Sequence, residues 1–134
     1  IDLDRIGIDG ALEISQEEKA ERVKVFLDAV HYLYRDIKGR RENFSPLFII
    51  GGRYNRKNPF FENRVRVEKN KINVSTLREV LEEDKDIENN TVVGVMTNIF
   101  DNDQEIREEL NATTVGKVFD HLKEEVEKYY GESN

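Results

Sequence analysis

The 134-residue chain has no cysteine, only two prolines and no apolar run as long as a membrane span. The absence of cysteine excludes disulfides and thiolate metal sites, and it is compatible with a reducing cytoplasm. A helix that spans a membrane needs roughly 20 consecutive apolar residues. We therefore expect a cytoplasmic protein that does not enter a membrane.

The sequence also lacks the short motifs of common enzyme and cofactor sites. His31 and His121 fall in predicted helices without HExxH spacing, and Ser45 has no GxSxG context. Gly51-Gly52 fits neither phosphate-binding fingerprint, GxGxxG or GxxxxGK[ST]. A turn with positive φ and the close approach of a phosphate backbone explain this glycine pair equally well. We expect no catalytic residue, no metal and no cofactor.

Positive charge is concentrated in one part of this acidic chain. Between Lys38 and Lys71 there are ten Lys and Arg against three Glu, a net charge of +7, whereas the whole chain carries −7. We call residues 38–71 the basic segment. Arg binds phosphate bidentately and stacks on bases, and the aromatic rings of this segment can stack as well. Its composition predicts a polyanion-binding face, with single-stranded nucleic acid favoured because no duplex-reading helix motif is visible.

Hydrophobic spacing predicts strands alternating with helices. Ser15 and Glu18 form a capping box, and the helix that they begin is expected to reach Ile37 and to stop at Gly39. The other predicted elements are strands over 1–8, 46–50, 64–68 and 91–100, a loop over 53–63, and helices over 75–81 (capped by Ser75), 104–110 and 114–130 (capped by Thr113 or Thr114).

This order of elements predicts an α+β fold. It matches the ferredoxin-like β-α-β-β-α-β plan, an antiparallel sheet with helices on one face, plus a C-terminal helix. RNA-recognition domains use the same plan. We expect residues 1–134 to form a single domain. Because Ile1 opens directly into a predicted strand, we also expect this domain to be a fragment of a longer protein.

Two pairs of carboxylates leave an enzyme alternative open. Asp2/Asp4 lie two residues apart on a predicted strand and Asp101/Asp103 follow another, and Mg²⁺ prefers such oxygen ligands. An EF-hand is disfavoured because Ile106 takes the place of the required glycine. Helix capping is the simpler interpretation of both pairs. The alternatives are therefore a metal-dependent nuclease, or a regulatory domain whose basic segment docks an acidic protein.

A spaced series of short motifs resembles one protein family. The motifs are IDLDRIGI at 1–8, Glu21-Arg22, the apolar run Val30–Leu33, Gly39-Arg40-Arg41 and Ser45-Pro46-Leu47. They are similar to the C-terminal half of the DevR-type CRISPR-associated proteins, the Cas-seven backbone subunits of type I interference (Cascade) complexes. The resemblance covers roughly residues 1 to 61, and the N-terminal half of the family, with its thumb-like insertion, is not in this chain.

The resemblance implies an RNA-recognition-type palm in antiviral defence. Such a protein polymerises along CRISPR RNA, holds the backbone of this single-stranded RNA without sequence preference, and performs no catalysis. Its partners are the RNA, further copies of itself and the other subunits of the complex. The positions that match as RNA contacts are Arg40, Arg41, Arg53, Tyr54, Arg56 and Lys57. We interpret Arg64 and Arg66 as the solvated face of a strand.

Overall fold

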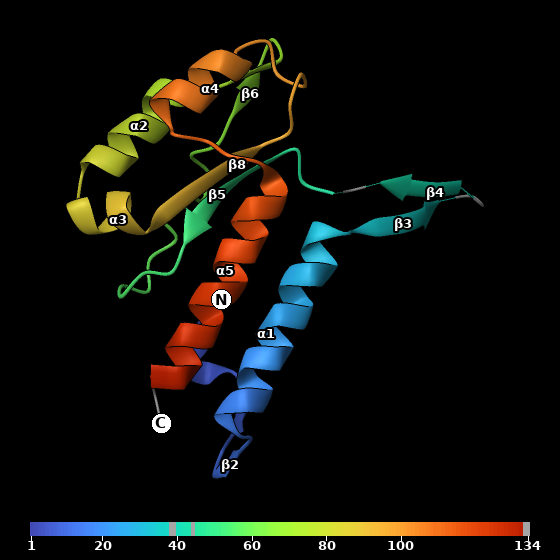
Figure 1. Ribbon diagram of the computed structural model, residues 1–134, viewed down its shortest axis with the longest axis vertical. Coiled ribbons are helices and arrows are strands. Elements are labelled where there is room, and N and C mark those ends of the chain that lie inside the picture. Colours follow the sequence, from blue (N-terminus) through green and yellow to red (C-terminus); the bar gives the residue numbers. More distant parts are fainter. Residues whose placement is uncertain (38–39, 44, 133–134) are drawn as a thin grey trace. The chain divides into compact units, whose positions relative to one another are not determined.

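A computed structural model describes residues 1–37, 40–43 and 45–132 of the chain (Figure 1). The α+β class is confirmed, because the described residues form five α-helices and four two-stranded antiparallel sheets. The ferredoxin-like strand order is not confirmed, because these strands pair only as β1–β2, β3–β4, β5–β8 and β6–β7. No helix in the described ranges is both long and apolar enough to cross a lipid bilayer.

The chain divides into two compact units, Ile1–Pro46 with Phe119–Asn134, and Leu47–Val118. We call them the first and the second unit. The prediction of a single domain over 1–134 stays a prediction.

The core of the first unit lies between two helices. α1 (Gln16–His31) begins where the sequence predicts, because the Ser15 hydroxyl accepts a hydrogen bond from the Glu18 N–H at 3.2 Å. Its partner is α5 (Val115–Glu132), whose first residues belong to the second unit. The buried side chains packed between the two helices are Ala20, Val23, Val126 and Tyr130.

The predicted continuation of α1 to Ile37 is wrong. Tyr32 leaves helical geometry with φ −110° and ψ 38°, and β3 (Tyr34–Ile37) then pairs antiparallel with β4 (Arg40–Asn43). Tyr34 and Ile37 fit a helical spacing, but they are also good strand residues, and the pairing with β4 decides between the two. Gly39, the expected helix stop, lies outside the described residues.

The predicted strand over 1–8 is also wrong. Residues 3–5 form a short 3₁₀ helix, η1 (Leu3–Arg5), because the Asp2 carboxylate accepts a hydrogen bond from the Asp4 N–H at 3.1 Å and caps this turn. A small hairpin of β1 (Ile8–Asp9) and β2 (Leu12–Glu13) follows. Asp9-Gly10, a residue pair typical of turns, lies at its tip, where Gly10 has a φ of +58°.

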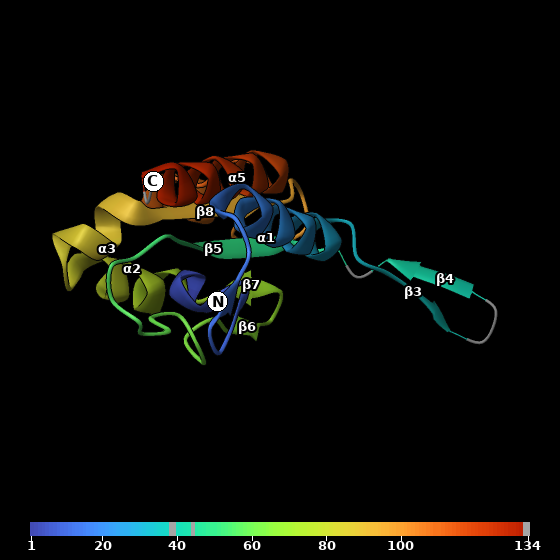
Figure 2. The ribbon, with the colours of Figure 1, turned by 90° about the horizontal axis from the view of Figure 1, so that it is seen from below.

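The second unit is built on the antiparallel pair of β5 (Phe48–Gly52) and β8 (Thr91–Val95). Three helices, α2 (Val74–Glu82), α3 (Lys85–Asn90) and α4 (Asp103–Glu109), complete it. Figure 2 shows α2 on one side of this pair. The buried core comprises Ile72, Val74, Leu77, Leu81, Ile87, Val93, Val95, Ile106 and Leu110.

Several predicted boundaries in this unit need correction. The predicted strand over 64–68 shrinks to β6 (Val67–Glu68), which forms a hairpin with β7 (Lys71–Ile72). Lys69 and Asn70 at its tip have φ values of 50° and 61°, as a two-residue hairpin turn requires. The predicted strand over 91–100 ends already at Val95.

Some helix starts agree with the sequence-based prediction and others do not. Ser75 lies inside α2 rather than at its cap, since the N-cap is Asn73. The short helix α3 was not predicted, and the Asp84 carboxylate caps it by accepting a hydrogen bond from the Asp86 N–H at 2.8 Å. The expected cap of α5 is confirmed for Thr114, whose hydroxyl accepts a hydrogen bond from the Lys117 N–H at 3.2 Å.

Candidate nucleic-acid interface

Four of the six predicted contact residues lie together on one loop of the second unit. Arg53, Tyr54, Arg56 and Lys57 follow β5 directly, in the predicted loop that runs on to a turn at residues 60–64. We call residues 53–64 the β5 loop. The other two candidates, Arg40 and Arg41, lie on β4 of the first unit, and their side chains are outside the described part of the chain.

Aromatic side chains anchor the β5 loop to the core of the second unit. The half-buried rings of Tyr54, Phe60 and Phe61 all pack against this core. The Tyr54 hydroxyl lies 2.6 Å from the hydroxyl of Thr91 on β8, and its ring meets that of Phe60 edge-on, with centroids 5.1 Å apart. Burial raises the pKa of Tyr54, and the hydrogen bond to Thr91 opposes this rise. Anchoring is the role that the structure gives these rings, and base stacking by Tyr54 stays a prediction.

The two adjacent glycines of β5 differ in their surroundings. Both lie inside the strand and neither has a positive φ, so the interpretation as a positive-φ turn is wrong. A Cβ atom on Gly52 would lie 1.8 Å from the backbone oxygen of Asn90, so this glycine is required by close packing. A Cβ on Gly51 would meet nothing within 4 Å. Gly51 therefore leaves open space beside the start of the β5 loop.

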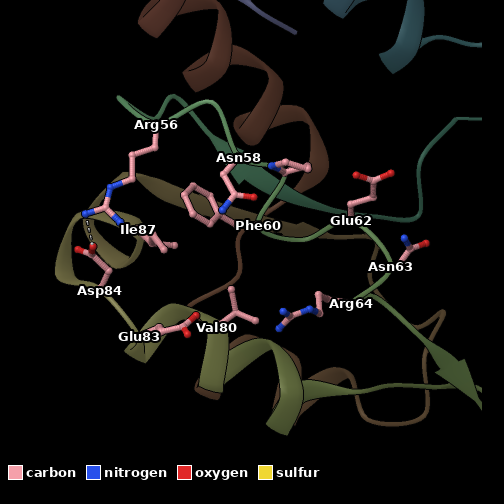
Figure 3. A pocket seen from close by; sticks show the side chains of 11 residues that line it. Arg56, Asn58, Phe60, Glu62, Asn63, Arg64, Val80, Glu83, Asp84 and Ile87 are labelled. Carbon is pink, nitrogen blue, oxygen red and sulfur yellow. Dashed lines mark ion pairs between the residues drawn. The ribbon is translucent and has the colours of Figure 1, made fainter.

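A pocket of about 480 Å³ lies between the β5 loop and the helices α2 and α3 (Figure 3). The surface that its lining exposes is mostly polar, because Val80 and Ile87 are buried and Phe60 is half-buried. Charged and polar side chains form the rest of the lining. The lining residues are Arg56, Asn58, Pro59, Phe60, Glu62, Asn63, Arg64, Val80, Glu83, Asp84 and Ile87.

Two arginines of the loop border this pocket from opposite sides. The Arg56 guanidinium forms an ion pair with the Asp84 carboxylate at 3.1 Å, although the Arg56 side chain is 67% exposed. The Arg64 side chain reaches toward Val80 from the other side, as Figure 3 shows. Arg64 lies in a turn, where its N–H donates to the Phe61 carbonyl at 3.0 Å, so its interpretation as part of a strand face is wrong. Within the described ranges it forms no ion pair.

The carboxylate pairs of the nuclease alternative have structural partners. Asp2 caps η1, and Asp4 accepts a hydrogen bond from the Tyr129 hydroxyl, which raises the pKa of Tyr129 to about 12. Asp101 accepts a hydrogen bond from the Asn70 amide at 3.0 Å, and Asp103 pairs with Arg107 at 2.8 Å. Among the described residues, no group of three potential ligands is placed to hold a metal ion.

Comparison with known proteins gives no relative: no family model, curated protein or solved structure matches this chain. The residues themselves therefore carry the functional proposal.

Sequence reasoning missed one part of the site, the side of the pocket formed by α2 and α3. Glu83 and Asp84 lie in a stretch that the sequence marks only as polar. The cap at Asp84 was the available signal, because an Asp followed by a short run with one apolar residue, Ile87, is typical of a brief capped helix.

Proposed function

We propose that this chain is a CRISPR RNA-binding backbone subunit of a type I antiviral effector complex. In this proposal it works in the cytoplasm, assembles with further copies and with other subunits along the RNA, and belongs to a ferredoxin-like palm that includes the β5–β8 pair. The motif series of residues 1 to 61 supports the family. The observation that carries RNA binding is the anchored β5 loop, which presents Arg53, Arg56, Lys57 and Arg64 from one short stretch of chain.

Anchoring matters because RNA binding through an ordered loop avoids part of the entropic cost of fixing its side chains. The guanidinium groups of the β5 loop are suited to bidentate contacts with phosphate oxygens, which do not depend on base identity. The open space at Gly51 allows a nucleic-acid backbone to pass close to the strand. The acidic remainder of the chain disfavours RNA elsewhere on the surface, which confines binding to the basic segment.

Incubating the full chain with labelled single-stranded RNA, with and without Mg²⁺ or Mn²⁺, tests the proposal against the nuclease alternative. We expect the fluorescence anisotropy of the RNA to rise with protein concentration. We also expect the RNA to run unchanged on a denaturing gel. Shortened RNA in the presence of the metal would support the nuclease instead, and no binding at low salt would rule out the proposed function of this chain.

Asp84→Asn is expected to strengthen RNA binding about 1.4- to fivefold, because exposed ion pairs such as Arg56–Asp84 contribute about 0.2–1 kcal/mol. The substitution removes the charge that competes with phosphate for Arg56. It keeps a side chain able to cap α3. Anisotropy titrations at constant salt measure the change.

Glu109→Gln is the matched control, since it removes one negative charge from an exposed position on α4 away from the pocket. If Asp84→Asn binds RNA no more tightly than Glu109→Gln does, Arg56 is not at a phosphate.

A further inference from the structure

The pocket beside the β5 loop is lined by side chains that phosphate binding alone does not require. Phosphate contacts need cations and backbone N–H groups, whereas the lining of this pocket also includes the half-buried ring of Phe60, beside the buried side chains of Val80 and Ile87. Its volume of about 480 Å³ lies in the range of pockets that bind small organic molecules. A planar ring that enters it packs against the exposed part of Phe60 and meets polar groups at its edge. A nucleobase has this shape and chemistry.

The polar groups of the pocket determine which pattern of hydrogen-bond donors and acceptors on a base it can bind. The exposed Glu83 carboxylate lies beside Val80 in the lining of the pocket, whereas Glu62 points away from it (Figure 3). A carboxylate only accepts hydrogen bonds, so it favours a base with N–H donors and disfavours one that presents carbonyl oxygens. Asn58 adds an amide that both donates and accepts.

We propose that this pocket receives one base of the bound RNA and prefers guanine to uracil there. Guanine carries adjacent N1–H and N2–H donors, which one carboxylate, that of Glu83, accepts together. Arg64 and Arg56 hold the phosphates that flank the inserted nucleotide, from the two sides of the pocket. This inference rests on the proposed function. It adds a base preference at one position to binding that is otherwise independent of sequence.

The test compares RNAs of equal length under identical salt conditions by anisotropy. One RNA is all uridine, a second alternates uridine with guanosine, and a third alternates uridine with inosine, which lacks the 2-amino group. We expect the guanosine RNA to bind about fivefold more tightly than the uridine RNA, the lower end of what a bidentate base contact contributes, because the pocket is open to solvent. The inosine RNA should fall between the two.

Glu83→Gln distinguishes the effect of the base contact from the effect of the pocket's charge on RNA affinity. It removes a negative charge and so raises the affinity for every RNA, but the ratio between guanosine and uridine RNA should fall to near one. Glu79→Gln, on an exposed position of α2 outside the pocket, makes the same charge change and should keep the wild-type ratio. Circular dichroism checks that both variants fold.

The outcomes distinguish this inference from the proposed function. Equal affinity of the wild type for the three RNAs, or a ratio unchanged by Glu83→Gln, overturns the base pocket and leaves RNA binding in place. If none of the RNAs binds, the proposed function fails and the base pocket fails with it.

Discussion

Gly52→Ala is expected to destabilise the second unit severely, by about 3 kcal/mol or more, the upper end of the cost of overpacking. The added Cβ would lie 1.8 Å from the backbone oxygen of Asn90 and 2.8 Å from its carbonyl carbon. Both atoms belong to the backbone just before β8, so no side-chain rotation relieves the contact. To relieve the contact, either β5 and β8 separate near Gly52 or the end of α3 at Asn90 moves away from β5.

Thermal unfolding followed by circular dichroism measures this effect. We expect the Tm of Gly52→Ala to fall by about 10 °C or more, from the usual relation between free energy and Tm for domains of this size. Gly51→Ala is the matched control, because its Cβ meets nothing within 4 Å in the same strand. It should be neutral or slightly stabilising, since alanine restricts the unfolded chain more than glycine does. Equal Tm values for the two variants would contradict the close packing at Gly52.

The double variant Arg53→Ala with Arg56→Ala is expected to bind RNA about 25-fold more weakly than the wild type at about 0.1 M salt. For a single strand, affinity varies with salt concentration to the power of about −0.7 for each phosphate that the protein neutralises. At about 0.1 M salt, one such contact therefore contributes about fivefold to the affinity. Both residues are in the β5 loop, Arg56 exposed and Arg53 half-buried, and circular dichroism checks that the variant folds. Loss of their side chains should therefore weaken RNA binding while the protein remains folded.

A second double variant, Arg5→Ala with Arg22→Ala, controls for net charge. It removes two positive charges from exposed residues of η1 and α1 in the first unit. If binding depends on the β5 loop, this control changes RNA affinity much less than the loop variant does. An equal loss in both variants means that overall charge, rather than the loop, holds the RNA.

Helix positions were largely predictable from the sequence because their signals are local. Ser15 and Thr114 cap α1 and α5 as expected, since a cap and a period of 3.6 residues act within a few turns of one helix. The helix centres at Leu77 and Ile106 are also where the apolar spacing predicts them, and both side chains are fully buried.

Strands were less predictable because their partners lie elsewhere in the chain. Tyr34 and Ile37 fit the helical spacing of α1, yet pairing with β4 makes them a strand. The requirement for glycine at position 52 arises from Asn90, thirty-eight positions further along, and no local pattern could show it. The chain from 1 to 8 alternates like a strand, but the Asp2 cap turns it into η1.

The sequence predicts the positive charge of the candidate site, but it does not predict how the loop is anchored or that a pocket lies beside it. The composition of the basic segment identifies Arg53, Arg56 and Lys57, which share one loop in the structure. It does not show that Tyr54 and Phe60 are core residues that hold this loop in place. The pocket also escaped prediction, because Glu83 and Asp84, the caps between α2 and α3, lie far from the β5 loop in the sequence.

The dependence of RNA affinity on salt concentration is the most direct test of the central claim that this chain binds RNA through the β5 loop. For wild-type protein and uridine RNA, log affinity should fall linearly with log salt, with a slope of about −2 to −3 if three or four loop cations each neutralise one phosphate. The slope measured for the Arg53/Arg56 double variant should be shallower than the wild-type slope by about 1.4. A wild-type affinity that does not change with salt, or a slope that both proteins share, would contradict the claim.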